Sequence, residues 1–201
     1  MNIAVLASGN GSNLQALMDA EGRGELAGGK IVLAVSDNPE AYALKRARDK
    51  GVETFVLEKT GFKSREEYDK AIVQSLREKK IELVVLAGFM RVLSPYFVDE
   101  YRDRIINIHP ALLPSFRGAY GIKEAYENGV KVTGVTVHFV TKQLDAGPII
   151  LQAEVEIAED DDMDSLEEKI HKVEHKLYPE AVRLFVQGKL RIEGKKVKVM
   201  K

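Results

Sequence analysis

The chain contains no cysteine, and its 201 residues carry almost no excess of either charge. The lack of cysteine excludes disulfides, thiolate metal sites and a cysteine nucleophile. With 30 basic and 31 acidic side chains the formal net charge is −1, so no basic excess exists to neutralise a nucleic-acid backbone. We therefore expect no nucleic-acid partner.

The sequence also lacks a long apolar segment. It holds no stretch of about 18 apolar residues, the length that crosses a bilayer. The first eight residues read as a strand, without the basic start and apolar run of a signal peptide. We therefore expect a cytoplasmic protein without a membrane partner. We also expect a monomer or a weak homodimer, although nothing in the sequence fixes the oligomeric state.

Short apolar runs are present throughout the chain and predict strands. They cover residues 2–8, 30–36, 52–57, 82–87, 104–109, 132–140 and 148–157. The early runs are almost continuously apolar, which is typical of parallel strands buried on both faces. Between them, amphipathic segments predict helices that begin near Ser12 or Asn13, cover 39–50, follow Ser64, follow Ser94-Pro95, and extend from near Asp164 or Ser165 to before Gly188.

Local signals support several of these helix ends. Gly51 fits a left-handed residue just past a helix, and Ser64 with Glu67 fits a capping box. Ser94 followed by Pro95 fits an N-cap and a first-turn proline. The acidic run 159–162 is expected to form a solvated loop before the last helix.

The alternation of strands and helices over 1–109 predicts a parallel sheet with helices on both faces. The later strands lack long helical connections, so the C-terminal part of the sheet should be antiparallel. At this length the chain can bury roughly 70% of the surface that its unfolded form exposes, which one domain achieves without a staple. We predict a single α/β domain over residues 1–201, with a mostly parallel sheet and an antiparallel C-terminal part.

A glycine-rich turn, Ser8–Asn13, follows the first predicted strand and opens the first helix. Glycines there permit close backbone approach, and the helix start offers free N–H groups to an anion, so the turn suits a phosphate. A dinucleotide fingerprint would need a third glycine where Leu14 stands, although Asp37 could still meet a ribose. A nucleotide P-loop would need a lysine that is absent. A tight turn that binds no ligand is a further interpretation, which the sequence leaves open.

The strongest chemical signal is the segment 105–110, Ile-Ile-Asn-Ile-His-Pro. Side chains two apart on a strand share a face, so Asn107 and His109 project together at the carboxyl end of the strand, where open α/β sheets bind ligands. An amide N–H can stabilise the oxyanion of an acyl transfer, an effect of about 10²–10³ in rate. Histidine titrates near neutral pH and can donate a proton, which contributes about 10²–10⁴.

Asp145 lies in a predicted turn, Gln143–Pro148, after a strand. A carboxylate beside His109 would favour the imidazolium form and hold a proton-relaying water. Ordinary turn chemistry explains an aspartate before Gly-Pro equally well. The sequence alone does not show that Asp145 meets His109.

Five segments together resemble the folate-dependent glycinamide ribonucleotide formyltransferases. They are Gly9–Asn13, Leu86–Arg91, Asn107–Pro114, Gly134–Val140 and Leu144–Pro148. The resemblance covers almost the whole chain in order, and the Asn-x-His-Pro-x-Leu-Leu-Pro block is specific to the formyltransferase superfamily. It implies a single-domain Rossmann-like formyltransferase fold, with a phosphate-substrate site in the N-terminal half, a folate site in the C-terminal half and the catalytic residues between them.

The resemblance also implies roles for individual residues. The implied catalytic positions are Asn107, His109 and Asp145, with Asn107 also touching the folate. Residues implied to hold the phosphorylated substrate are Gly11, Ser12, Asn13 and Glu174, the last at its glycinamide end. Residues implied to bind the folate are Arg65, Met90, Arg91, Val92, Leu93 and Val140, with the loop 141–147 completing the pocket.

The implied reaction is transfer of the formyl group of 10-formyltetrahydrofolate to the amine of N1-(5-phospho-D-ribosyl)glycinamide, in purine synthesis, without a metal. One departure concerns Ile122, where many family members carry a histidine. It leaves the contacts of the loop 119–122 open.

A competing motif is His171-Lys172-Val173-Glu174-His175, which fits the H-x-x-E-H pattern of inverted zinc peptidases. A third ligand would have to come from elsewhere, so we favour a substrate role for Glu174 and no metal. His138 either lines the active-site wall or is a hydrogen-bonded structural histidine.

Three other functions remain as alternatives. Methionyl-tRNA formyltransferase resembles the chain near the site, but it would need a nucleic-acid-binding domain and a basic surface. Formyltetrahydrofolate hydrolase shares the catalytic residues, but it normally carries an N-terminal regulatory domain, whereas the first strand here is expected from residue 2. A phosphate-binding regulatory module would keep the glycine turn without needing Asn107, His109 and Asp145 together.

Overall fold

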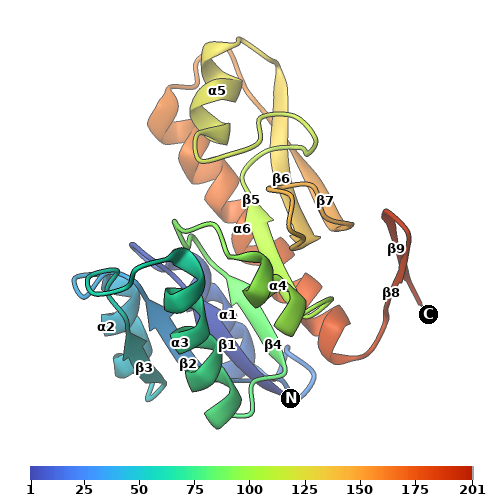
Figure 1. Ribbon diagram of the computed structural model, residues 1–201. Coiled ribbons are helices and arrows are strands. Elements are labelled where there is room, and N and C mark those ends of the chain that lie inside the picture. Colours follow the sequence, from blue (N-terminus) through green and yellow to red (C-terminus); the bar gives the residue numbers. More distant parts are fainter. Residues whose placement is uncertain (201) are drawn as a thin grey trace.

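The computed structural model describes residues 1–200 as one mixed β-sheet with helices on both faces (Figure 1). The strand order is β3-β2-β1-β4-β5-β6-β7-β9-β8. The strands are β1 (Asn2–Leu6), β2 (Lys30–Ser36), β3 (Glu53–Val56), β4 (Leu83–Leu86), β5 (Ile105–His109), β6 (Val132–Phe139), β7 (Ile149–Glu156), β8 (Leu190–Glu193) and β9 (Lys196–Val199). The helices are α1 (Ser12–Gly22), α2 (Tyr42–Asp49), α3 (Arg65–Glu78), α4 (Pro95–Glu100), α5 (Gly121–Glu127) and α6 (Met163–Val186).

The sheet changes direction at β5, as the sequence predicts. The first five strands are parallel, β5 and β6 are antiparallel, and so are β6 and β7. The chain runs outward from β1 through β2 to β3, and then restarts on the other side of β1 with β4 and β5. The strand order therefore reverses between β1 and β4, which is the position where open α/β sheets bind ligands.

Two apolar cores, one on each face of the sheet, hold these layers together. Alternate residues of β1 divide between them: Ile3 and Val5 pack with α1, α2 and α6, while Ala4 and Leu6 pack with α3 and α4. This alternation explains why the parallel strands are apolar on both faces. The helices on both faces that the sequence predicts are thus confirmed.

Most helix ends agree with the local signals, with two corrections. Gly51 follows α2 with φ +74°, and Ser94 caps α4 by accepting from the amide of Phe97 at 3.3 Å. Ser64 caps α3, but the Glu67 carboxylate accepts from Lys63 N–H, so the reciprocal capping box is wrong. Helix α2 begins at Tyr42 instead of residue 39, because residues 38–41 form a turn in which the amide of Ala41 donates to the Asn38 carbonyl oxygen at 3.1 Å.

The sequence interpretation missed three short elements, α5 and the hairpin β8–β9. The hairpin lies at the margin of the molecule beside the C-terminus (Figure 1), and a single residue pair joins β9 to β7. The acidic run 159–162 is the predicted loop, and Asp162 and Ser165 form the capping box of α6. Within residues 1–200, no helix combines the length and the apolar character needed to cross a bilayer.

Candidate active site

One cleft of about 840 Å³ opens at the carboxyl ends of β1, β4 and β5. Twelve of the thirteen residues predicted for the site line it, namely Gly11, Ser12, Asn13, Met90, Arg91, Val92, Leu93, Asn107, His109, Val140, Asp145 and Glu174. Arg65 is the exception: it is the exposed first residue of α3 and does not line the cleft. The fold therefore brings together residues that are as much as 163 positions apart in the chain, from Gly11 to Glu174.

The glycine turn after β1 is packed too closely for any other residue at Gly11. Its φ is +76°, and an added Cβ would lie 2.6 Å from the Cβ of Ala43 on α2. Gly11 immediately precedes α1, so the first amides of that helix are free to meet an anion at the cleft. Asp37 does not face a ribose site but accepts from the Ser8 hydroxyl at 2.6 Å, which removes the support for a dinucleotide fingerprint.

Apolar side chains form the rim of the opposite part of the cleft. Met90, Val92 and Leu144 are 71, 50 and 51% exposed, although they are large and apolar. Exposed apolar groups beside a cleft with a few polar groups are typical of a site for a small organic ligand.

Asn107 lies on the same face of β5 as His109, as the strand period predicts. Ile106 and Ile108 on the other face belong to the core under α6. The Asn107 amide nitrogen is 3.1 Å from His138 Nε2, and His138 Nδ1 is 2.9 Å from the Phe139 carbonyl oxygen. Because a carbonyl oxygen only accepts, Nδ1 carries the proton and Nε2 of the neutral ring accepts from Asn107. Burial lowers the pKa of His138, which is consistent with this neutral ring.

Asp145 lies between two histidines. Its Oδ2 is 3.7 Å from His109 Nδ1, and its Oδ1 is 3.7 Å from His138 Nε2. These separations are too long for direct hydrogen bonds and suit a bridging water or a small closure. The convergence of Asp145 and His109, which the sequence left open, is therefore present.

A loop after β5 holds both groups. The amide of Gly118 donates to Asp145 Oδ2 at 2.8 Å, and His109 Nε2 donates to the Phe116 carbonyl oxygen at 2.7 Å. Asp145 itself has φ +46°, a left-handed conformation that aspartate tolerates in turns. The turn predicted from Asp-Ala-Gly-Pro therefore aims the carboxylate into the cleft.

Glu174 on α6 meets the glycine turn directly. Its Oε2 accepts from the Asn13 side-chain amide at 2.9 Å, and the side chain is buried. Burial raises the pKa of Glu174, and the Asn13 hydrogen bond opposes this rise. Two residues predicted for the phosphorylated substrate, one near each end of the chain, are thus in contact.

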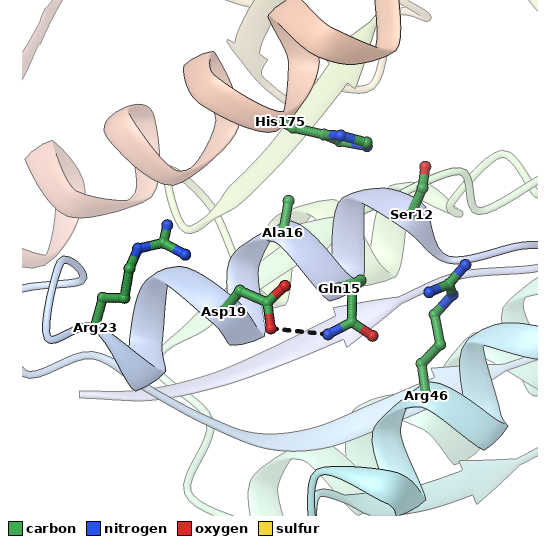
Figure 2. Close-up of a pocket in the computed structure, with 7 residues that line it drawn as sticks. All are labelled: Ser12, Gln15, Ala16, Asp19, Arg23, Arg46 and His175. Carbon is green, nitrogen blue, oxygen red and sulfur yellow. Dashed lines mark hydrogen bonds between the residues drawn. The ribbon is translucent and has the colours of Figure 1, made fainter. Parts of the chain in front are cut away.

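The histidines of the H-x-x-E-H motif flank Glu174. The rings of His171 and His175 are stacked with centroids 6.1 Å apart, and His171 Nε2 is 3.9 Å from the Glu174 carboxylate. His175 faces a second cavity of about 380 Å³ with Ser12 on α1 and Arg46 on α2 (Figure 2). Residues 1–200 contain no group of three histidine, aspartate or glutamate side chains that could bind a metal ion.

Gly118 and Glu167 are among the lining residues that were not predicted. Glu167 lies two helical turns before Glu174 on α6, so the helix period would have placed both on one face. Gly118 and Ala119 belong to a loop without a periodic signal. Ile122, where the chain departs from many family members, lines the cleft as well.

Comparison with known protein families matches residues 1–182 to the family described as formyl transferase. The chain belongs to this family. It is 43% identical to the phosphoribosylglycinamide formyltransferase of Escherichia coli (strain K12) over 192 residues, which cover 96% of this chain and 90% of that protein. It is also 47% identical, over 188 residues, to the trifunctional purine biosynthetic protein adenosine-3 of Drosophila melanogaster.

The latter match covers 92% of this chain but only 14% of the longer protein, so the chain corresponds to a small part of that relative. Among solved structures, the chain is similar to the glycinamide ribonucleotide transformylase 1 of Symbiobacterium toebii. The TM-score is 0.98 with 43% identity, over 100% of this chain and 94% of that one. The Rossmann-like formyltransferase fold expected from the sequence is confirmed.

Proposed function

We propose that this protein transfers the formyl group of 10-formyltetrahydrofolate to the primary amine of N1-(5-phospho-D-ribosyl)glycinamide. The products are the N-formyl compound and tetrahydrofolate, in de novo purine (IMP) biosynthesis. The name of the E. coli relative, 90% of which the match covers, and the name of the S. toebii structure support phosphoribosylglycinamide as the formyl acceptor.

The observation that carries the proposal is a single cleft shared by a phosphate cradle, an apolar rim and three polar groups. Gly11 and Asn13 lie at one end, Met90 and Val92 line another part, and Asn107 is at the end of β5. Two substrates bound in one cleft react by a positioned attack instead of a bimolecular collision, which can lower the barrier by about 7–11 kcal/mol.

The proposed chemistry balances within these residues. The neutral amine attacks the formyl carbon, and the carbonyl oxygen becomes an oxyanion. Asn107 uses one amide hydrogen on His138 and has a second one for the oxyanion. The bond from the formyl carbon to the folate nitrogen then breaks, that nitrogen gains a proton, and the substrate amine loses one.

His109 and Asp145 are proposed to carry these protons. A water between His109 Nδ1 and Asp145 Oδ2, which are 3.7 Å apart, would take the proton of the amine and return one to the leaving nitrogen. The amide of Gly118 holds Asp145 in place for this relay. Protonated His109 would also stabilise the oxyanion.

We extend the proposal to the organisation of the chain. Residues 1–201 would act as one formyltransferase domain, with the phosphate-substrate site in the N-terminal half and the folate site in the C-terminal half. Met90–Leu93 belong to the N-terminal half by sequence, so the proposed folate site spans both halves at the cleft. A cytoplasmic monomer or weak homodimer without nucleic-acid, membrane or metal partners stays a prediction, which sizing and metal analysis would test.

A spectrophotometric folate assay tests the function. Tetrahydrofolate should appear from 10-formyltetrahydrofolate only when phosphoribosylglycinamide is present. Equal release without the amine would indicate a hydrolase and contradict the proposal. Ligand-dependent stabilisation without turnover of any formyl donor would indicate a binding module instead.

A further inference from the structure

The segment Gly88–Ser94 forms much of the proposed folate side of the cleft, yet it has no regular secondary structure. It connects β4 to α4. Two of its backbone amides donate to side chains of other elements: Met90 to Ser8 Oγ at 2.9 Å and Ser94 to Asp69 Oδ2 at 2.5 Å. Between these anchors, the N–H groups of Arg91, Val92 and Leu93 donate no hydrogen bond within residues 1–200.

Asp69 is an unusual residue for its place in α3. The side chain is 1% exposed, and the neighbouring buried positions of the helix are Tyr68, Ile72, Val73 and Leu76. A buried carboxylate is costly unless it is hydrogen-bonded or near a positive charge. Burial raises the pKa of Asp69, while the Ser94 amide, Arg91 and Arg65 oppose that rise.

The same turn of α3 also supports the middle of the segment. The Arg91 guanidinium carbon is 4.1 Å from the centre of the Tyr68 ring, and the Tyr68 hydroxyl donates to the Leu57 carbonyl oxygen at 2.7 Å. Arg91 Nε is buried and has no hydrogen-bond partner within residues 1–200. Tyr68 and Asp69 therefore contact the segment on the side of α3, while its other side faces the cleft.

We propose that Asp69 is a positioning residue for folate binding: by accepting from the Ser94 amide, it fixes the C-terminal end of the segment Gly88–Ser94 against α3. The proposal rests on the proposed function, because it concerns the folate side of the cleft. Asp69 is not among the residues that line the cleft, so its proposed role is indirect. A carboxylate at this place holds the amide more strongly than a neutral acceptor would, because hydrogen bonds to ionised groups are about twice as strong.

Steady-state kinetics of three variants test this role. Asp69→Ala should raise the KM for 10-formyltetrahydrofolate about 10-fold, the effect of losing one hydrogen bond to a charged group. The kcat and the KM for phosphoribosylglycinamide should stay within about 3-fold, since the glycine turn and β5 are held by other contacts. Asp69→Asn, whose side-chain oxygen can still accept from Ser94, should restore most of the folate KM. Glu66→Ala, an exposed carboxylate on the same helix, is the matched control.

Three results would overturn the proposal while leaving the proposed function intact. They are an unchanged folate KM in Asp69→Ala, an equal loss of kcat and of both KM values, and an Asn variant as impaired as the Ala variant. Absence of formyl transfer by the unmodified protein would instead contradict the proposed function.

A measurement on the unmodified protein covers the case in which Asp69→Ala does not fold. Amide hydrogen exchange should show the Ser94 N–H protected well above those of Arg91 and Val92. Exchange of Ser94 at the rate of its unbonded neighbours would show that Asp69 does not hold the segment.

Discussion

The two sides of the cleft are built differently. One side, the parallel wall, consists of the segments 8–13 and 88–93, which follow β1 and β4 directly. The other, the loop wall, consists of 118–122 and 140–145, which belong to connections around the antiparallel strands. In the parallel wall, the Ser8 amide donates to the Gly88 carbonyl oxygen, so the two segments hold one another.

The loop wall depends on turn conformations instead. Asp145 adopts φ +46°, and at Gly147 an added Cβ would lie 1.8 Å from the Phe139 carbonyl oxygen. The hydrogen bond from the Gly118 amide to Asp145 Oδ2 links the two segments of the loop wall. The parallel wall therefore follows from strand topology, whereas the loop wall follows from a few special backbone positions. We assign binding mainly to the former and proton transfer to the latter.

The largest expected effect is on turnover, at the junction of the two walls. His109→Ala and Asp145→Asn should each lower kcat by about 10²–10⁴, because each removes one part of the proposed proton relay. Their melting temperatures should show that the fold survives. Near-normal turnover in either variant would refute the catalytic assignment.

A stability measurement next separates the roles of two glycines in the parallel wall. Gly11→Ala should lower the free energy of unfolding by roughly 2–5 kcal/mol, through a left-handed backbone and a clash with Ala43. Gly9→Ala is the matched control, since nothing lies within 4 Å of its Cβ position. Chemical denaturation would measure both. Equal stability of the two variants would contradict the close packing of the turn.

A smaller effect is expected from Glu174, and it depends on pH. Because burial raises the pKa of Glu174, the folded protein binds this proton more tightly than the unfolded chain does, and stability falls as pH rises above about 4.3. Glu174→Gln keeps an acceptor for Asn13 and removes the charge. It should melt about 2–4 °C higher at pH 7, the shift for about 1 kcal/mol in a chain of this size.

This gain should shrink as the pH falls toward 4, where Glu174 becomes protonated in the unmodified protein too. A gain that is independent of pH would show that ionisation of Glu174 is not its cause. A raised KM for phosphoribosylglycinamide in the same variant would accompany a direct substrate contact.

The smallest effect is expected at Arg65, outside the cleft lining. Arg65→Ala should raise the KM for the folate by about 2- to 5-fold, as for an exposed charge pair, and added salt should reduce the difference. An effect as large as that of Asp69→Ala would indicate that α3 moves onto the ligand and extends the parallel wall.

Much of the fold could be predicted because apolar runs and helix signals agree along the first half of the chain. Buried parallel strands must be apolar on both faces. The apolar runs Ile3–Leu6 and Leu83–Leu86 therefore predict strands without any knowledge of the strands they pair with. The hairpin β8–β9 was missed because none of its strand residues is buried and only one residue pair joins it to the rest of the sheet. Helix α5 was missed because its seven residues span only two turns, too few for a clear period.

For the site, the sequence by itself determined the residue types and their local geometry. A strand period of two places Asn107 with His109, and a glycine turn before a helix leaves the first helical amides free, because both features depend only on neighbours in the chain. The tertiary structure decided that Asp145 meets His109, that Glu174 reaches Asn13 and that Asp69 holds Ser94. Those contacts join residues 25 to 161 positions apart, and only the packing of β6, α6 and α3 against the sheet sets such distances.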